Sequence, residues 1–569
     1  MIARQLFAVV LVAAVSLDTL ASPGAVAAPL PLASAMSVHY SLAVNVDDQH
    51  QVVDTQETVE ATNLTDATLG SLVFEVIPRH FSGFQMGTVT VDGTRVQPTF
   101  DDVVMEIPLR SPLASNATAR LTMAFKETVP SIGTPSYEFG DGILALGHWF
   151  PELTSYQAGS WDRQRFSDVG NPFLVEAADY QVTVKTDPHV VIASTGVVTK
   201  HQGGEWTLAA NGVRGFALAL SRQYQSRSAS VDGTRITTYF LPGDAAEGEA
   251  VLNDTRLSFD WLTRHLGPYG YPTLALAETP GLTATTSGDE FPNLGFLAVA
   301  RARQPATARD SLTYLVADET ARQWCASVVA SDGAGQPWLT EGLATQLGFL
   351  FLKDHDSNAY SAGWARLQTD DAQAVATWGT KPLDTPAADY PDSDQYTGLL
   401  VPRAAIFLEQ LRETMGTDAY FTFLRDFVAT YRGGIATTHD FLTLAERYAG
   451  HDLGDLYKGY FRPASYRERG TTVTPITVSS VVAPASATPA PVSSPVPTPP
   501  PASTPVVATP EAVQQPTIVP TIPATVVATP GATASSGGPG STFGLVVISS
   551  LVGLGVVGAL SYLLIQRQS

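Results

Sequence analysis

The sequence predicts an α+β protein in which a strand-rich half precedes a helical half, with non-globular segments at both ends. Two patterns indicate this order. Apolar and polar residues alternate with a period of two from residue 38 onward, and from residue 246 apolar residues recur three and four positions apart. The chain has 569 residues, of which 44% are hydrophobic and 15% are charged, so it can bury the cores of more than one domain.

The strand-rich half is predicted to cover residues 36–225. Segments with the alternating pattern are expected to be strands, at 38–46, 51–61, 88–91, 180–186, 190–194 and 215–221. Asp92 and Gly93 follow the third of these segments and form a dipeptide typical of a two-residue hairpin turn. An antiparallel connection is therefore expected at this point.

The helical half is predicted to cover residues 226–470. Segments with helical spacing lie at 250–266, 311–329, 339–352, 402–415, 419–430 and 438–448. Ser311 can cap the start of the second of these helices, and a Ser-Asp-Gly segment at 331–333 ends it.

The two ends of the chain predict export and membrane anchoring. Residues 1–27 read as a signal peptide, because Arg4 precedes an apolar run of about a dozen residues and then small residues. That run is shorter than the roughly 20 residues that a spanning helix needs. Residues 543–565 are long and apolar enough to cross a bilayer as a helix. Arg567 in the short tail 566–569 favours the cytoplasmic side, so we expect a single-pass protein with its large domain outside the cell.

Residues 471–542 separate the body from the predicted membrane helix. They consist mainly of Pro, Thr, Ala, Val and Ser, and Glu511 is their single charged residue. Such a segment cannot build a core, and its prolines favour an extended chain, so it reads as a stalk. A disordered linker without a spacing role fits the same composition equally well.

Charge and cysteine content exclude several classes of protein. The net charge of −21 argues against a nucleic-acid partner and against adhesion to anionic lipid headgroups. The single cysteine, Cys325, excludes an intrachain disulfide. Its place after Trp324 in an apolar helical stretch predicts a buried and unreactive thiol.

One motif carries recognisable chemistry. Residues 318–322 read D-E-T-A-R, and Glu341 follows on the next predicted helix. In the zinc-peptidase pattern H-E-x-x-H, two histidines bind the metal, the glutamate between them is the general base, and a later glutamate is the third ligand. Asp318 and Arg322 stand at the two histidine positions, whereas the base Glu319 and the distal carboxylate are present.

Over residues 38–462 the chain resembles the membrane alanyl aminopeptidase family of gluzincins, which are zinc metallopeptidases. G-H-W-F-P at 147–151 is similar to a landmark of that family's β domain, and G-P-Y-G-Y-P at 267–272 is similar to the entrance of its catalytic domain. The resemblance implies a saddle-shaped β domain over 36–225 and a thermolysin-like, mainly helical domain over 226–470.

The resemblance also implies roles for individual residues. Glu319 matches the general base, Glu290 matches the glutamate that binds the substrate's free amino terminus, and Tyr396 matches the tyrosine that stabilises the oxyanion. Asp289 departs from the family's usual methionine, and Thr397 stands where a lysine is typical. Asp289 makes the expected site more acidic than that of the family.

The predicted site lacks the ligands that zinc requires. Asp318 and Glu341 could each supply an oxygen, but the guanidinium of Arg322 has no acceptor lone pair and stays protonated. The body histidines His148 and His265 have no place in the family's ligand set and are expected to be structural. We therefore expect no metal and no other cofactor. A bound metal lowers the pKa of water from about 15.7 to about 7. Without a metal, the general base has no activated water from which to take a proton.

The charges suggest what replaces the metal. We expect Arg322 to occupy the metal position as a structural cation that neutralises Glu290, Glu319 and Glu341. The alternative is an ordinary surface pair between Asp318 and Arg322, which would contribute about a few tenths of a kcal/mol.

These inferences predict a membrane-anchored extracellular pseudopeptidase, whose partners are peptides or protein N-termini. Catalysis is not expected, because both zinc-ligand histidines are replaced. Two alternatives stay open. The chain could be an active metal-dependent aminopeptidase with an atypical metal site, or a structural surface module with a vestigial cleft.

Overall fold

The computed structural model describes residues 34–134, 136–171, 174–280, 288–299 and 311–466. The predicted signal peptide (1–27), stalk (471–542), membrane helix (543–565) and tail (566–569) lie outside these residues and remain predictions. Within the described ranges, no helix is both long enough and apolar enough to cross a membrane.

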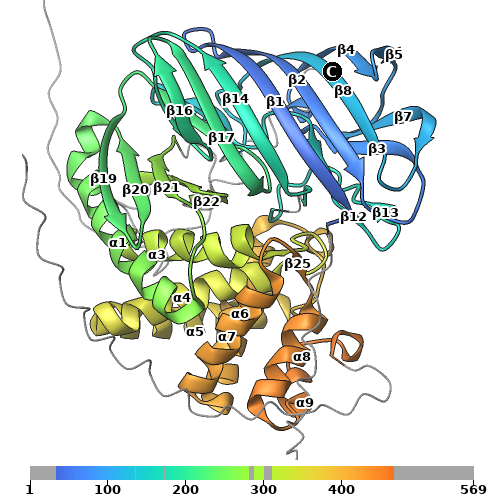
Figure 1. Cartoon of the computed structure of the whole chain (residues 1–569). Helices are drawn as coiled ribbons and strands as arrows, with labels where there is room; N and C mark the ends of the chain where they lie inside the picture. Colours follow the sequence, from blue (N-terminus) through green and yellow to red (C-terminus); the bar gives the residue numbers. More distant parts are fainter. Residues whose placement is uncertain (1–33, 135, 172–173, 281–287, 300–310, 467–569) are drawn as a thin grey trace, which may run out of the picture. The chain divides into compact units, whose positions relative to one another are not determined.

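The N-terminal part is all-β, and its largest element is an eight-stranded sheet with the order β16-β17-β14-β1-β2-β8-β4-β5 (Figure 1). The bounds are β1 (Met36–Asp47), β2 (Val52–Asn63), β4 (Gln85–Val91), β5 (Thr94–Val96), β8 (Thr118–Thr128), β14 (Ala178–Lys185), β16 (Val197–Gln202) and β17 (Glu205–Val213). Along β1, Val38, Tyr40, Leu42 and Val44 are buried and alternate with more exposed residues. The period-two prediction is therefore confirmed for this strand, because one face of the sheet meets the core.

The predicted hairpin turn is present between β4 and β5. Asp92 has φ 49° and Gly93 has φ 75°, so both central residues occupy the left-handed region that a tight hairpin requires. The two strands pair in antiparallel register on either side of this turn.

The β part also contains two four-stranded sheets, with the orders β15-β18-β10-β9 and β11-β3-β7-β6, and a two-stranded sheet of β12 (Tyr156–Gln157) and β13 (Ser160–Trp161). The bounds are β3 (Leu69–Glu75), β6 (Thr99–Asp101), β7 (Val104–Leu113), β9 (Tyr137–Gly140), β10 (Ile143–Leu146), β11 (Glu152–Leu153), β15 (Val191–Ser194) and β18 (Leu218–Ser221). Side chains from these sheets and from the eight-stranded sheet share one core. At its centre Tyr40 stacks on Tyr180 with ring centroids 4.8 Å apart, beside the buried Trp149 and Phe150.

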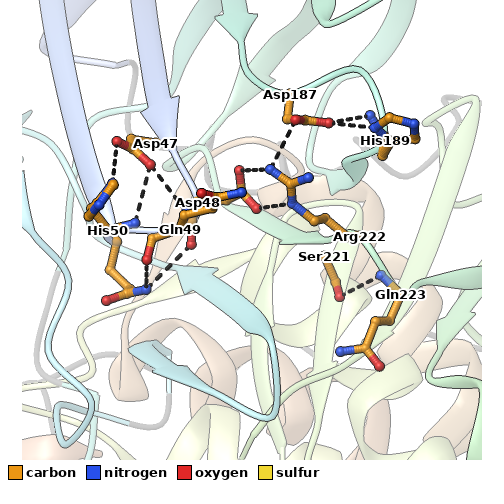
Figure 2. Close-up of polar contacts among 10 residues, drawn as sticks. Asp47, Asp48, Gln49, His50, Asp187, His189, Ser221, Arg222 and Gln223 are labelled. Carbon is orange, nitrogen blue, oxygen red and sulfur yellow. Dashed lines mark hydrogen bonds and ion pairs between the residues drawn. The ribbon is translucent and has the colours of Figure 1, made fainter.

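Three turns of the β part are joined by one arginine. Arg222 follows β18 and binds Asp48, which follows β1, through bonds of 2.5 and 3.0 Å (Figure 2). The same guanidinium lies 3.0 Å from Asp187, which follows β14 and accepts a bond from His189. Because β1 and β14 run parallel and pair, their C-terminal ends lie side by side. Arg222 therefore links the C-terminal ends of these two strands to β18 of the neighbouring sheet.

The second part begins with a five-stranded sheet that the sequence patterns did not predict as a whole. Its order is β19-β20-β21-β23-β22. The bounds are β19 (Gln225–Val231), β20 (Thr234–Phe240), β21 (Thr273–Glu278), β22 (Gly288–Phe291) and β23 (Leu294–Leu297). In this order β22 is the last strand and runs antiparallel to β23.

A two-stranded sheet of β24 (Ala330–Ser331) and β25 (Ile435–Ala436) also lies in the second part, and helices make up most of the rest (Figure 1). They are α1 (Ala245–Leu266), α3 (Leu312–Arg322), α4 (Trp338–His355), α5 (Ser357–Trp378), α6 (Ser393–Met415), α7 (Thr417–Tyr431), α8 (Thr438–Ala449) and α9 (Gly454–Tyr457). Every predicted helix is present, although α3 ends at Arg322 and continues as a π-helix over Gln323–Val328. Ser311 caps α3 as predicted, because its side chain accepts a bond from the Tyr314 N–H.

Candidate functional site

Arg322 lies among four carboxylates at the end of α3. Its Nη2 donates to Glu341 Oε2 at 2.8 Å, and its Nε donates to Asp318 Oδ2 at 2.9 Å. Its Nη1 is 3.5 Å from Glu290 Oε2, and its Nε is 3.9 Å from Glu319 Oε1. One guanidinium therefore contacts the carboxylates of the motif and the glutamate that the resemblance assigns to the substrate's amino terminus.

Two helices and one strand position these side chains. Asp318 and Arg322 are four residues apart on α3 and so lie on one face of that helix. Glu341 is in the first turn of α4, which packs against α3. Glu290 belongs to β22, which also contacts α3. The site thus depends on how α3 packs against both neighbours.

Gln323 ties the end of α3 to the turn that follows β22. Its Oε1 accepts bonds from the Tyr269 hydroxyl at 2.8 Å and from the Asn293 N–H at 2.9 Å. Its Nε2 donates to the Phe291 carbonyl at 3.1 Å. Because Gln323 is fully buried, these bonds have no competition from water, and they fix the strand that carries Glu290.

The charged cluster is buried. The side chains of Arg322 and Asp318 are 14% and 8% exposed, so an exposed surface pair does not describe them. Burial raises the pKa of Glu290 to about 7, although Arg322 lowers it. Burial alone would lower the pKa of Arg322, but the surrounding carboxylates, Glu341 first, raise it well above its ordinary value. Arg322 is therefore a fixed cation, as a metal ion would be.

Glu319 is buried, and its carboxyl group is only partly hydrogen-bonded among the residues that the structure describes. Its side chain is 4% exposed, and its Oε2 makes no hydrogen bond within the described part of the chain. Gly288 lies against it, and a Cβ at that position would overlap the Glu319 carboxylate. Burial raises the pKa of Glu319 well above its ordinary value, which favours the neutral form. A neutral carboxyl group cannot take a proton from water as a base does.

A cavity of about 100 Å³ adjoins the cluster. Its lining includes Glu290, Glu341 and Tyr396, three residues predicted to belong to one site. His148 and Arg214 from the β part also line it. The volume is below the range of about 300–1,000 Å³ that is usual for pockets that enclose a small molecule. It suits one small group.

Two lining residues had no predicted role at the site. His148 Nδ1 is 3.0 Å from a Glu152 oxygen. Burial lowers the pKa of the imidazole, but the hydrogen bond and charge of Glu152 outweigh burial, so the pKa is raised. Arg214 donates to the carbonyl oxygens of Val175 at 2.6 Å and of Gly433 at 3.2 Å. The G-H-W-F-P landmark at 147–151 contains His148, but no sequence signal marked Arg214.

The donor set at this site does not fit zinc. The oxygens of Asp318 and Glu341 that would bind a metal are already bonded to Arg322, which has no lone pair to offer. In the part of the chain that the structure describes, no group of three or more His, Cys, Asp or Glu residues is arranged to hold a metal ion. Zinc usually takes three protein ligands in catalytic sites. A metal could enter this position only if the Arg322 side chain left the cluster.

The thiol prediction agrees with the structure. Cys325 is 6% exposed, its Sγ lies 3.3 Å from the Ala321 carbonyl, and burial raises its pKa. A buried thiol with a raised pKa carries little thiolate, so it is a poor nucleophile.

Comparison with known proteins adds to this geometry. Residues 287–460 match the Peptidase family M1 domain. Aminopeptidase N of Streptomyces lividans is 23% identical over 239 residues, which are 38% of this chain and 26% of that protein. Aminopeptidase M1-A of Oryza sativa subsp. japonica is 19% identical over 245 residues, which are 42% of this chain and 28% of that protein. The chain therefore aligns with less than a third of either relative.

Solved structures match over a longer stretch. An M1 zinc metallopeptidase from Deinococcus radiodurans matches with a TM-score of 0.55 and 20% identity, covering 79% of this chain and 97% of that chain. A mutant of the Deinococcus radiodurans enzyme, bound to a Tyr-Ser-Ala substrate, matches with a TM-score of 0.54 and 19% identity. At this identity the likeness shows a shared fold. Together, these matches agree with the resemblance to the M1 aminopeptidase-like gluzincins that the sequence predicted.

Proposed function

We propose that this chain is a pseudopeptidase, an aminopeptidase-like module whose cleft excludes zinc because Arg322 occupies the metal position. One observation carries the proposal: a single guanidinium lies within 3.9 Å of Glu290, Asp318, Glu319 and Glu341. The guanidinium offsets part of the charge of these carboxylates, but it binds no water as a Lewis acid does.

Peptide hydrolysis on this scaffold would need an activated water, a base and an oxyanion donor. A bound metal supplies the first by lowering the pKa of water from about 15.7 to about 7. Burial favours neutral Glu319, which removes the base. Tyr396 lines the cavity and could donate a hydrogen bond to an oxyanion, but one donor cannot replace the missing nucleophile.

We propose that the cleft binds peptide N-termini instead of cleaving them. Glu290 lies 3.5 Å from Arg322, a longer contact than those of Asp318 and Glu341, so its carboxylate keeps room for a second cation. A peptide ammonium would stabilise the ionised form of a carboxyl whose pKa burial raises to about 7. The cavity of about 100 Å³ would then hold the first residue of the peptide.

The predicted termini give this module its place in the cell. A signal peptide at 1–27, a stalk at 471–542 and a membrane helix at 543–565 would display the module outside the cell, with a short tail in the cytoplasm. Such a position suits a receptor for peptides or for the N-termini of other proteins.

Calorimetric titration of the detergent-solubilised full chain tests this function. A tripeptide with a free amino terminus should bind at least about tenfold more tightly than its acetylated form, a difference of about 1.4 kcal/mol. Glu290→Gln should abolish the preference. Glu60→Gln should keep it, because Glu60 is an exposed residue on β2 that pairs with Arg120.

Two results would replace the proposal with one of the alternatives. No heat with either peptide would favour a structural surface module. Release of amino-acid anilides that a chelator abolishes would show an active metal-dependent aminopeptidase.

A further inference from the structure

A second and larger cavity lies among the helices, and it shares no lining residue with the first cavity, the cleft beside Arg322. Its volume is about 900 Å³, against about 100 Å³ for the cleft. Residues from α1, α4, α6 and α7 line it, and none of them lines the cleft. This volume falls in the range of about 300–1,000 Å³ that is typical of pockets for small organic ligands.

Basic side chains gather around this cavity, although the chain as a whole carries a net charge of −21. Four basic and two acidic residues line it: Arg264, Lys353, Arg412, Arg425, Asp354 and Asp418. The local excess of positive charge is the reverse of the charge on the rest of the protein, which points to an anionic occupant.

Helix ends account for three of these cations. Arg264, Lys353 and Arg412 lie in the last turns of α1, α4 and α6, where a positive side chain stabilises the helix dipole. Arg264 also pairs with Asp260 at 2.7 Å, and Arg412 pairs with Glu409 at 2.6 Å. The structural roles of these three residues are therefore largely explained without a ligand.

Arg425 has no such explanation. It lies in the middle of α7, away from either helix end. It makes no ion pair with a carboxylate in the described part of the chain, where its guanidinium donates to the His265 carbonyl at 3.5 Å and to the Thr422 hydroxyl at 3.2 Å. A guanidinium has five N–H donors, so Arg425 keeps several for a ligand. Lys353 also faces the cavity, with its Nζ 3.8 Å from Glu409 and 5.2 Å from the centroid of the Tyr360 ring, contacts that are looser than the ion pairs of Arg264 and Arg412.

The floor of the cavity is aromatic. The rings of Trp261 and Phe421 meet edge to face with centroids 5.8 Å apart. The His265 ring lies 4.0 Å from that of Trp261 and 4.4 Å from that of Phe421. The indole N–H is already bonded to Asp354 at 2.8 Å. Trp261 and Phe421 are 2% and 8% exposed, so the half-buried His265 ring is the most accessible of the three and suits contact with a flat, apolar group.

We infer that this cavity binds a small organic anion. Its flat apolar body would pack on His265, beside the buried Trp261 and Phe421, and its carboxylate or phosphate would bind Arg425 and Lys353. Burying the apolar body releases water from the cavity, and the guanidinium forms charge-assisted bonds with the anionic group. A large polyanion would meet the acidic surface beyond the cavity, so a small ligand is favoured.

Calorimetry with three naphthalene compounds tests this inference on the detergent-solubilised full chain. 1-Naphthoate and 1-naphthyl phosphate carry the two anionic groups on one ring system, and 1-naphthol is their neutral counterpart. We expect at least one anion to bind with a stoichiometry of one per chain, and about tenfold or more tightly than naphthol. The stronger of the two anions identifies the preferred head group.

Variants then locate the binding site. Arg425→Gln should weaken anion binding about tenfold and leave naphthol unchanged, because it removes one charge-assisted interaction. Arg366→Gln is the matched control, since Arg366 is 52% exposed and pairs with Asp370 on α5. If Arg425→Gln does not fold, Lys353→Gln provides the same comparison. Equal affinity for all three compounds, no saturable binding, or anion affinity unchanged by either cavity variant would each overturn the inference.

Discussion

Replacing Arg322 with Met tests how the carboxylate cluster is stabilised. Met keeps much of the side-chain length and removes the charge. Glu341 and Asp318 would lose charge-assisted bonds of 2.8 and 2.9 Å, each worth about 1.5–3 kcal/mol. Since the Arg322 side chain is 14% exposed, water can compensate little, and removing one partner of a buried pair costs about 3–5 kcal/mol. We expect a loss of about 4 kcal/mol in unfolding free energy at pH 8.

The loss should depend on pH. Arg322 lowers the pKa of Glu290, which burial raises to about 7, so removing Arg322 would raise that pKa further. A carboxyl group whose folded pKa exceeds its unfolded pKa contributes stability below the unfolded value and loses it as pH rises through the folded value. The Met variant should therefore recover part of its stability at pH 5, where Glu290 and Glu319, whose pKa values burial raises, bind protons.

Urea unfolding followed by tryptophan fluorescence at pH 5 and pH 8 measures both effects. Arg366→Met is the control, because Arg366 forms an exposed pair with Asp370 at 2.7 Å and should lose less than about 0.5 kcal/mol at either pH. A loss below about 1 kcal/mol for Arg322→Met at pH 8, or an equal loss at both pH values, would refute the reasoning.

Two further substitutions test buried groups by urea unfolding. Glu57 in β2 is 1% exposed, neither of its oxygens has a hydrogen-bond partner among the described residues, and burial raises its pKa. The unfolding free energy of the wild type should fall as pH rises from the unfolded pKa of about 4.3 through the higher folded value, because the buried carboxylate then becomes charged. Glu57→Met should therefore raise the unfolding free energy by about 1–3 kcal/mol at pH 8 and by less at pH 4. An equal gain at both pH values would contradict this. Gly288→Ala should lose about 1–3 kcal/mol, because the new Cβ would overlap the Glu319 carboxylate. Gly70→Ala should be nearly neutral, because no atom lies within 4 Å of its Cβ position, and equal losses for the two glycines would exclude the overlap as the cause.

Periodicity predicted the elements that bury one face. Strand β1 alternates buried and exposed residues, and α8 has one apolar face, so both were visible in the sequence. Strand β21 was not, because five of its six residues are buried, and a short apolar run does not separate a strand from a helix. Helix α5 buries only three of its 22 residues (Gly363, Leu367 and Ala374), so it lacked an apolar stripe to recognise.

The site was predictable where its residues are close in the sequence or match a known pattern. The four-residue spacing of Asp318 and Arg322 placed them on one helical face, and the family pattern supplied Glu290 and Glu341. The resemblance did not extend to Arg214, which reaches the cavity from the β part. The second cavity was also beyond prediction, because residues from four helices form it and no local spacing marks them.

The central claim is that Arg322 takes the place of a metal ion. Its most direct test is the zinc content of the purified protein, measured beside an Asp318→His, Arg322→His double variant after dialysis against zinc. The wild type should retain no stoichiometric zinc, whereas the double variant should bind about one ion per chain, through two imidazoles and Glu341. Stoichiometric zinc in the wild type, removable by a chelator, would contradict the account.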